Sequence, residues 1–463
     1  MPRTHKAMLA VATPTTLELI GNTPLVQLRG FDTGLCSLYL KLESQNPGGS
    51  IKDRMAIAMI EAAERTGALL PGQTLVEATA GNTGIGLALV SAIKGFRLIL
   101  VIPDKMSPEK IAHARALGAD IRLTRSDVAP GHPDYYQDMA ARIARDEHCY
   151  HIDQFANPAN PAAHETTTGP EIWSQLNHAV DAVVCGVGSG GTMTGLSRFF
   201  ARVRPETEMV LADPEGSSLY EYVRTGRRVP SGSYAVEGIG GACVPAIADL
   251  SRVRTAYSIS DRESFETSRE LLRRTGIFAG GSSGTLLAAA LRYCRAQTLP
   301  RQVVTFVCDT GAKYLSKLYN DYWMQDQGFI ERVRKGDLQD LVTRKYEEGA
   351  VITVGPEDSL LTAFQRMRLA DISQVPVIEN GRCAGVLDES DLLLAVHDDH
   401  SRFGAPVRSA MTSRLETIAH DESIARLYGI LDRGLVALVL DGDQFLGLIT
   451  RTDLLIHLRR QLQ

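Results

Sequence analysis

The sequence NPGGSIKDR, residues 46–54, is the most informative part of this chain. It places Lys52 directly after a glycine-rich turn and at the start of a predicted helix that runs through residues 55–64. Glycines let the backbone approach a bulky ligand, and the free N–H groups of a helix start attract a carboxylate or phosphate. A lysine held there can carry an aldehyde cofactor as a Schiff base. Taken alone, the stretch also fits an ordinary strand-to-helix turn with a solvated lysine.

Three further loops separate strand-like from helix-like segments in the same way. TAGNTG, residues 79–84, offers hydroxyl, amide and N–H groups that suit a carboxylate. GVGSGGT, residues 186–192, follows a strand-like run and predicts a phosphate cradle, although it lacks the Gly-Lys-Ser/Thr ending of a nucleotide P-loop. GGSSG, residues 280–284, is the third. Together with the Lys52 turn, these loops predict ligand crevices at the carboxyl ends of parallel strands.

The remaining pattern predicts the α/β fold class. Apolar runs rich in β-branched residues, such as 97–102 and 303–308, alternate with amphipathic helical stretches. This alternation indicates mainly parallel sheets covered by helices. With 463 residues, of which 44% are hydrophobic, the chain can bury a large core and is long enough for two or three domains.

Charge and cysteine usage exclude several classes of function. A net charge of -5 gives no reason to expect a nucleic-acid partner. Residues 1–12 contain too short an apolar run for a secretion signal, and no other segment resembles a membrane span. The 7 cysteines show no CxxC and no metal-ligand spacing, as expected for buried thiols in a reducing cytoplasm. We therefore predict a cytoplasmic protein without membrane contact and without a metal site.

An internal repeat follows a charged segment at residues 331–340, which we predict to be a linker. GVLDESDL at 385–392 corresponds to GLITRTDL at 447–454, and each lies at the end of a strand-helix-strand-strand-helix pattern. Two such units bury together the faces that one alone leaves exposed. The predicted domains are a catalytic region at 1–330 with a smaller subdomain inserted at roughly 50–155, and repeat units at 341–397 and 404–463.

In these motifs the chain resembles the fold-type II pyridoxal-phosphate enzymes, and within them the cystathionine β-synthases of the bacterial kind. The resemblance covers nearly the whole chain, since LIGNTPL at 19–25 and VEGIG at 236–240 also occur in the family's order. The C-terminal repeat is similar to a tandem CBS (Bateman) module. The resemblance implies two open, helix-covered, mainly parallel sheets followed by that module.

The resemblance also assigns roles to single residues. Lys52 would carry pyridoxal 5'-phosphate and then act as the general base, a role that suits an amine whose pKa is lowered by burial. The remaining cofactor-binding residues would be Asn82, Gly188, Ser189, Gly190, Gly191, Thr192 and Ser282. The substrate-binding residues would be Thr79, Ala80, Thr83, Gln154 and Gly240. Alternatively, Ser189 and Ser282 are helix caps, and Asn82 and Gln154 are loop amides that satisfy backbone groups.

The implied reaction is a β-replacement that joins L-serine and L-homocysteine to cystathionine, with side reactions that release hydrogen sulfide. Phe155, where the eukaryotic synthases have tyrosine, and Gly241, in the loop thought to shape the homocysteine side, leave open a cysteine synthase that uses sulfide with O-acetylserine or serine. A non-catalytic nucleotide-sensing protein is the alternative from another class. The chain shows no counterpart of the haem-binding extension of some relatives, so we predict no haem. We also expect a homodimer or a higher homo-oligomer.

The second repeat keeps Thr450 and Asp453, a pair that contacts the ribose of adenine nucleotides in CBS modules. The first repeat has Asp388 ahead of Asp391, and the additional carboxylate would repel a phosphate-bearing ligand. We therefore predict a single site, near Thr450 and Asp453, for an adenine nucleotide or S-adenosylmethionine. The alternative is that the module only mediates subunit contacts, through the apolar helix face at 454–458.

Overall fold

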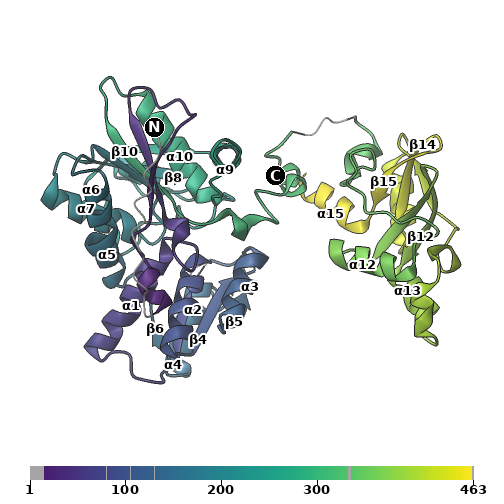
Figure 1. The fold of residues 1–463 in the computed structure, drawn as a ribbon, viewed down its shortest axis with the longest axis horizontal. Coiled ribbons are helices and arrows are strands. Elements are labelled where there is room, and N and C mark those ends of the chain that lie inside the picture. The colour runs from purple at the N-terminus through teal and green to yellow at the C-terminus, as the bar shows by residue number, and fades with distance from the viewer. Residues whose placement is uncertain (1–14, 80, 105, 130, 332–334, 461–463) are drawn as a thin grey trace, which may run out of the picture. The chain divides into compact units, whose positions relative to one another are not determined.

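The computed structural model describes the chain in five stretches, residues 15–79, 81–104, 106–129, 131–331 and 335–460. It divides into two compact units, Met1–Met324 and Gln325–Gln463 (Figure 1). The first unit contains two sheets, and the second contains two smaller ones.

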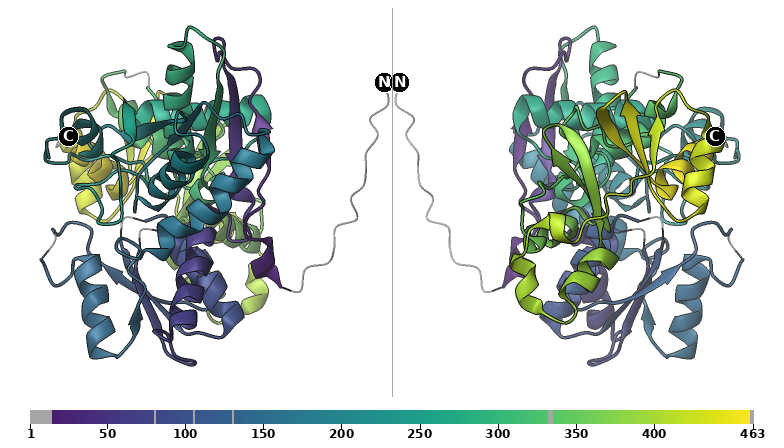
Figure 2. Two further views of the ribbon diagram at one scale, coloured as in Figure 1. Left: turned by 90° about the vertical axis from the view of Figure 1, so that its left-hand side faces the viewer. Right: turned by 90° about the vertical axis from the view of Figure 1, so that its right-hand side faces the viewer.

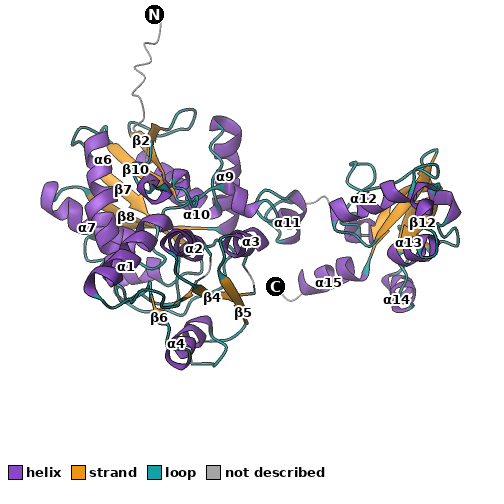
Figure 3. Ribbon diagram, turned by 60° about the horizontal axis from the view of Figure 1, so that its bottom comes forward, coloured by secondary structure: helices purple, strands orange, loops and turns teal. Residues whose placement is uncertain are grey.

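The larger sheet of the first unit has the strand order β1-β2-β10-β7-β8-β9, and only the pairing of β1 with β2 is antiparallel. Its inner strands are almost continuous runs of buried residues, as expected where helices cover both faces. Helices flank these strands (Figure 3). In chain order the strands are β1 (Leu25–Gln27), β2 (Ser37–Leu42), β7 (Ala182–Cys185), β8 (Glu208–Pro214), β9 (Val253–Ile259) and β10 (Gln302–Val307).

The smaller sheet has the order β5-β4-β3-β6, and all its pairings are parallel. Every residue of β3 and β4 is buried. The strands are β3 (Leu75–Ala78), β4 (Leu98–Pro103), β5 (Asp120–Thr124) and β6 (Tyr150–His151). The associated helices are α1 (Lys52–Thr66), α2 (Asn82–Lys94), α3 (Pro108–Ala116) and α4 (Tyr136–Asp146).

The other helices of the catalytic unit accompany the larger sheet. Helices α9 and α10 pack against each other and follow its edge strand β9. The bounds are α5 (Ala159–Ala163), α6 (Gly169–Gln175), α7 (Gly191–Val203), α8 (Leu219–Thr225), α9 (Asp261–Thr275), α10 (Gly281–Arg295) and α11 (Asp321–Asp326), and a short π-helix at His164–Thr168 joins α5 to α6. The predicted fold class, mainly parallel sheets covered by helices, is confirmed.

The second unit shows the internal repeat (Figure 2, right-hand view). In the second copy all five predicted elements form, whereas the strand predicted at 351–354 of the first copy is reduced to one bridge between Val354 and Val377. The first copy contains α12 (Leu360–Ala370), β11 (Gln374–Glu379), β12 (Arg382–Asp388) and α13 (Glu389–Val396). The second contains β13 (Thr417–Ala419), α14 (Ile424–Asp432), β14 (Ala437–Asp441), β15 (Gln444–Ile449) and α15 (Arg451–Arg460).

The end of the predicted linker is folded. Residues Leu338–Leu341 form a short 3-10 helix, and Leu338, Leu341 and Val342 pack in the core of the second repeat. The Leu338 N–H donates to the His420 carbonyl at 2.9 Å. This segment precedes the first repeat in sequence but completes the second in space, so the linker is shorter than the predicted 331–340.

Candidate functional site

Lys52 is the first residue of α1 and lies at the carboxyl ends of the larger sheet's strands. The preceding turn is fixed to the end of β10, because the Ile51 N–H donates to the Cys308 carbonyl at 2.8 Å and the Gly49 carbonyl accepts from the Thr310 N–H at 3.1 Å. A cavity there is lined by Lys52, by the thiols of Cys185 and Cys308, and by the loop at 186–192. The sequence-predicted lysine and the predicted phosphate loop therefore share one cavity.

The loop at 188–192 presents backbone N–H groups and leaves little room for side chains. Gly190 lies in the left-handed region with φ +93, and α7 begins at Gly191, so its first N–H groups are without helical partners. A Cβ on Gly188 would lie 2.4 Å from the Gly238 carbonyl oxygen, and one on Gly191 would lie 1.9 Å from Asn160 Oδ1. Among the described lining residues Lys52 is a cation and none is a carboxylate. The donors present fit the phosphate group of pyridoxal phosphate.

Neither of the two serines acts as the helix cap that the alternative interpretation requires. Ser189 Oγ accepts from Asn160 Nδ2 at 2.9 Å, and the N-cap residue of α7 is Gly190. Ser282 is buried at the second position of α10, whose N-cap residue is Gly280. Neither helix has a side-chain cap in the described structure. Both hydroxyls therefore lie near a helix start without capping the helix.

Asn82, the first residue of α2, is held at both ends of its amide by side chains. Its Nδ2 donates to Asp309 Oδ2 at 2.7 Å, and its Oδ1 accepts from Lys313 Nζ at 2.8 Å. These contacts do not fit the alternative of a loop amide that satisfies backbone groups. Sequence reasoning missed Asp309 and Lys313, although the polar segment DTGAK, residues 309–313, directly follows strand β10 and could have drawn attention to them.

The predicted substrate loop is ordered by hydrogen bonds among its own members. Thr83 Oγ1 donates to Gln154 Oε1 at 2.7 Å, and Thr79 Oγ1 accepts from the Gly81 N–H at 3.1 Å. Gln154 Nε2 donates to the Ala78 carbonyl at 3.0 Å and to Glu77 Oε1 at 3.2 Å. Ala80, predicted in the same loop, lies outside the described residues.

Gly240 lies beside the phosphate loop and not in the substrate loop itself. Its N–H donates to the Val187 carbonyl at 2.8 Å, and its φ of +81 is a conformation that glycine adopts without strain. A Cβ at this position would lie 2.6 Å from a ring carbon of Pro214 and 2.9 Å from the Tyr234 hydroxyl. Gly240 therefore lets the loop at 234–241 approach the cavity closely.

Burial controls the ionisation of the groups around the cavity. Desolvation lowers the pKa of Lys52, although Cys308 and Asp309 oppose that shift. Burial also raises the pKa of the Cys308 thiol to about 12 and raises that of Cys185 further above its ordinary value. Near neutral pH the thiols stay protonated, while the Lys52 amine loses its proton more readily than an exposed lysine.

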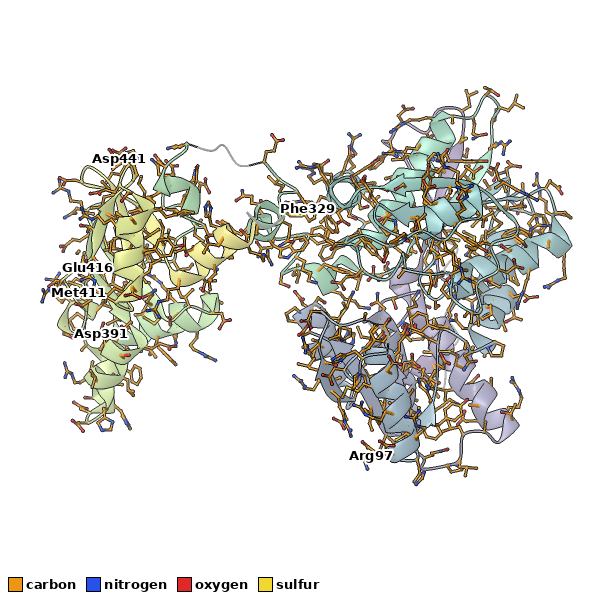
Figure 4. The ribbon with its side chains drawn as sticks, turned by 180° about the vertical axis from the view of Figure 1, so that it is seen from behind. Arg97, Phe329, Asp391, Met411, Glu416 and Asp441 are labelled. Atoms are coloured by element: carbon orange, nitrogen blue, oxygen red, sulfur yellow. The ribbon has the colours of Figure 1, made fainter. Side chains whose placement is uncertain are left out.

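In the second unit Thr450 and Asp453 are close together, as their spacing at the start of α15 predicts. Asp453 Oδ2 accepts from the Thr450 N–H at 2.8 Å and from its hydroxyl at 2.6 Å. Thr343, which sequence reasoning missed, donates to the other oxygen of Asp453. The equivalent carboxylates of the first repeat form a capping box, in which the Asp388 side chain accepts from the Asp391 N–H at 2.8 Å and Asp391 accepts from the Asp388 N–H at 3.3 Å (Figure 4 labels Asp391). The second repeat has the same reciprocal backbone contacts, since the Asp453 N–H donates to Thr450 Oγ1 at 3.4 Å, and differs in the hydroxyl groups that also donate to its carboxylate.

In the stretches that the structure covers, no three His, Cys, Asp or Glu side chains are grouped so that they could hold a metal ion. Likewise, none of the described helices has the length and apolar character needed to cross a membrane.

Comparison with known proteins identifies the class to which this fold and cavity belong. The family model described as "Pyridoxal-phosphate dependent enzyme" matches residues 16–309, and the CBS domain model matches residues 339–398 and 407–460. The chain belongs to the family of pyridoxal-phosphate dependent enzymes and carries a C-terminal pair of CBS domains. Membership and cofactor, both predicted from the motifs, are confirmed.

Within that family, the chain resembles the cystathionine beta-synthases over nearly its full length. It is 32% identical to the enzyme of Apis mellifera over 460 residues, covering 96% of this chain and 90% of that one. It is 35% identical to the enzyme of Mus musculus over 434 residues, covering 92% and 77%. Cysteine synthase B of Escherichia coli is 43% identical over 306 residues, which cover 65% of this chain and 95% of that one.

Solved structures match the catalytic unit. An O-ureido-L-serine synthase superposes with a TM-score of 0.62 at 33% identity, covering 68% of this chain and 100% of that one. A hydrogen sulfide-producing enzyme from Fusobacterium nucleatum superposes with a TM-score of 0.61 at 35% identity, covering 66% and 100%. These structures share the catalytic fold, whereas the cystathionine beta-synthases match the chain through both of its units.

Proposed function

We propose that this enzyme joins L-serine and L-homocysteine to cystathionine by β-replacement. The observation that carries the proposal is the position of Lys52, whose amine lies in one cavity with the anion-binding loop at 188–192. The agreement with cystathionine beta-synthases through the CBS pair as well as the catalytic unit supports this choice of substrates.

Different residues of the chain would bind the cofactor, accept the α proton and bind the amino acid. The Lys52 amine would hold the cofactor aldehyde, the 188–192 loop with Thr192 would hold its phosphate, and Asn82 and Ser282 would contact its ring. When bound, pyridoxal phosphate withdraws electrons from the α carbon of the amino acid and so makes the α proton removable. The released Lys52 amine accepts that proton, because its lowered pKa keeps part of it neutral. We assign the binding of the amino acid to Thr79, Ala80, Thr83, Gln154 and Gly240.

Borohydride reduction of the purified enzyme tests the role of Lys52. We expect peptide mass spectrometry to find the reduced cofactor on Lys52, because its amine is the one that lines the cavity. The Lys52→Ala variant should lose β-replacement by at least about a thousandfold and yet keep some non-covalent cofactor, since the phosphate loop is separate from the anchor. The matched control is Lys94→Ala, because Lys94 is a half-buried lysine on α2. Lys41→Ala is unsuitable as a control, because Lys41 is buried in an ion pair. A label on any other lysine contradicts the assignment.

A second candidate is a cysteine synthase that combines O-acetylserine or serine with sulfide. The higher identity to cysteine synthase B favours it, although that protein matches only the catalytic unit. Steady-state rates with homocysteine and with sulfide, each tested with serine and with O-acetylserine, separate the two. We expect the highest kcat/KM for serine with homocysteine, and slower release of hydrogen sulfide from cysteine, a side reaction consistent with the hydrogen sulfide-producing neighbour.

For the second unit we propose one site for an adenine nucleotide or S-adenosylmethionine at Thr450 and Asp453. The ordered hydroxyl and carboxylate of that pair, together with Thr343, support a sugar-binding role. We also propose a homo-oligomer in the cytoplasm. The 7 free cysteines fit a reducing compartment, and Leu455, which is 66% exposed on α15, offers apolar surface for a subunit contact, while its neighbour Leu454 is buried in the unit's own core.

A further inference from the structure

A buried lysine, Lys313, contacts the turn that carries Lys52 and ties together three parts of the catalytic unit. Lys313, on the short helix after β10, donates from Nζ to the carbonyls of Gly48 and Gly49 at 2.8 and 3.3 Å and to Asn82 Oδ1 at 2.8 Å. It therefore joins the turn that carries Lys52, the start of α2 and the end of β10. Its three donors meet three acceptors, and its side chain is only 4% exposed.

Charge fixes which way the Asn82 amide points. An ammonium group only donates hydrogen bonds and an ionised carboxylate only accepts them. Lys313 therefore requires the Asn82 oxygen on its side, and Asp309 requires the nitrogen on the other. Asp309 is itself held, since its Oδ2 also accepts from the Tyr314 hydroxyl at 2.7 Å. The Asn82 oxygen is therefore held on the Lys313 side, and its nitrogen, which donates one hydrogen to Asp309, has a second hydrogen on Nδ2 left to donate.

We propose that Lys313 is a positioning residue which, with Asp309, fixes the orientation of the Asn82 amide so that this side chain offers the bound cofactor an N–H donor from Nδ2. The carboxylates of Asp53 and Asp309 favour the charged form of Lys313, although burial lowers its pKa to about 8. An N–H donor stabilises a negatively charged oxygen on the cofactor ring, and it disfavours the protonated, neutral oxygen. The inference rests on the proposed function in requiring pyridoxal phosphate in this cavity.

The absorption spectrum of the bound cofactor reports this contact directly. The Lys313→Met variant should show a smaller fraction of the yellow form, which has the ionised ring oxygen, and should bind pyridoxal phosphate about tenfold more weakly. Asn82→Ala should do the same. The double variant should be no worse than Asn82→Ala alone, because both substitutions remove one interaction. Lys317→Met is the matched control, since Lys317 lies four residues after Lys313 and donates to Glu237. The cofactor spectrum of this variant should equal that of the wild type.

Two outcomes overturn the inference: a wild-type cofactor spectrum in Lys313→Met, or effects of Lys313→Met and Asn82→Ala that add fully. If circular dichroism shows that Lys313→Met does not fold, Asp309→Asn takes its place, because an amide at 309 no longer dictates the orientation of Asn82. An unchanged spectrum in that variant likewise overturns the inference. Borohydride labelling separates the two proposals, since labelled Lys52 with an unchanged variant spectrum contradicts only the role of Lys313, whereas unlabelled Lys52 contradicts the proposed function.

Discussion

Glu77 is a carboxyl group at a place where water cannot reach it. It lies on β3 with an exposure of 1%, and its Oε1 accepts from the Gln154 amide while Oε2 has no hydrogen-bond partner. Burial raises its pKa from the ordinary 4.5 to about 8. At neutral pH the folded enzyme therefore keeps Glu77 protonated, next to the side chain that orders the substrate loop.

This shift predicts a pH-dependent stability. Between about pH 4.5 and pH 8 the unfolded chain releases the Glu77 proton and the folded chain keeps it, so stability falls as pH rises through that window. Glu77→Gln, which cannot ionise, should remove this slope and be more stable than wild type at pH 8.5 by on the order of 3 kcal/mol. Urea unfolding from pH 5 to 8.5 measures the difference. Glu61→Gln, on the exposed face of α1, is the control, and equal slopes for wild type and Glu77→Gln would disprove the buried protonated state.

Single residues were predictable where their role is local. Lys52 and Asn82 stand in loops whose glycines and helix starts are visible in a dozen consecutive letters. Lys313 and Asp309 are not visible in this way, because their contacts with Asn82 span 231 and 227 positions and depend on how two sheets meet. Their identity as lysine and aspartate is unremarkable in sequence and becomes informative only through the partners that folding gives them.

At the scale of elements, helices α9 and α10 meet at a glycine. A Cβ on Gly284 would lie 1.9 Å from the Ser264 carbonyl oxygen and 2.3 Å from Ser268 Oγ. Ser268 Oγ also donates to the Gly280 carbonyl at 3.0 Å, so the same contact orders the loop that carries Ser282. The strands predicted at 97–102 and 303–308 form as β4 and β10 to within one residue, because buried parallel strands leave continuous apolar runs. Such runs did not reveal the helix spacing that requires Gly284.

Gly284→Ala should therefore separate α9 from α10 and destabilise the catalytic unit by about 1–3 kcal/mol, with weaker cofactor binding at Ser282. Gly429→Ala provides the matched control, since Gly429 is an exposed helical glycine in α14 with no atom near its Cβ position. That substitution should stabilise the second unit by roughly 0.5–1 kcal/mol. Calorimetric melting of both variants measures the effects, and a neutral Gly284→Ala would contradict the close packing.

For the whole molecule, the two repeats of the C-terminal unit are similar in fold and unequal in chemistry. Asp388 and Asp391 use their carboxylates to cap α13, whereas Asp453 receives hydroxyl donors from Thr450 and Thr343. The repeat could be derived from sequence, and its single ligand site stays a prediction. The participation of Thr343 could not, because the segment that precedes the first repeat packs against the second.

Titration calorimetry of the full chain with AMP, ATP and S-adenosylmethionine tests this asymmetry. We expect one ligand per chain for at least one of the three, and loss of that heat in Asp453→Ala, which removes the acceptor for the ribose hydroxyls. Asp391→Ala should keep the binding heat, while the loss of a helix cap lowers the stability of its unit by about 1 kcal/mol. Two ligands per chain, or binding that survives Asp453→Ala, would contradict a single site.

The order of strands in the larger sheet also governs how the enzyme can be made. Strand β2, near the N-terminus, is hydrogen-bonded to β10, which is the last strand of the catalytic unit to leave the ribosome. Until β10 is synthesised, β2 and β7 each expose an unpaired edge. The turn that carries Lys52 also lacks its hydrogen-bond partners at the end of β10. A nascent chain that ends before residue 302 should therefore depend on chaperones and fail to take up cofactor, however much of the Lys52 and phosphate loops has already been synthesised.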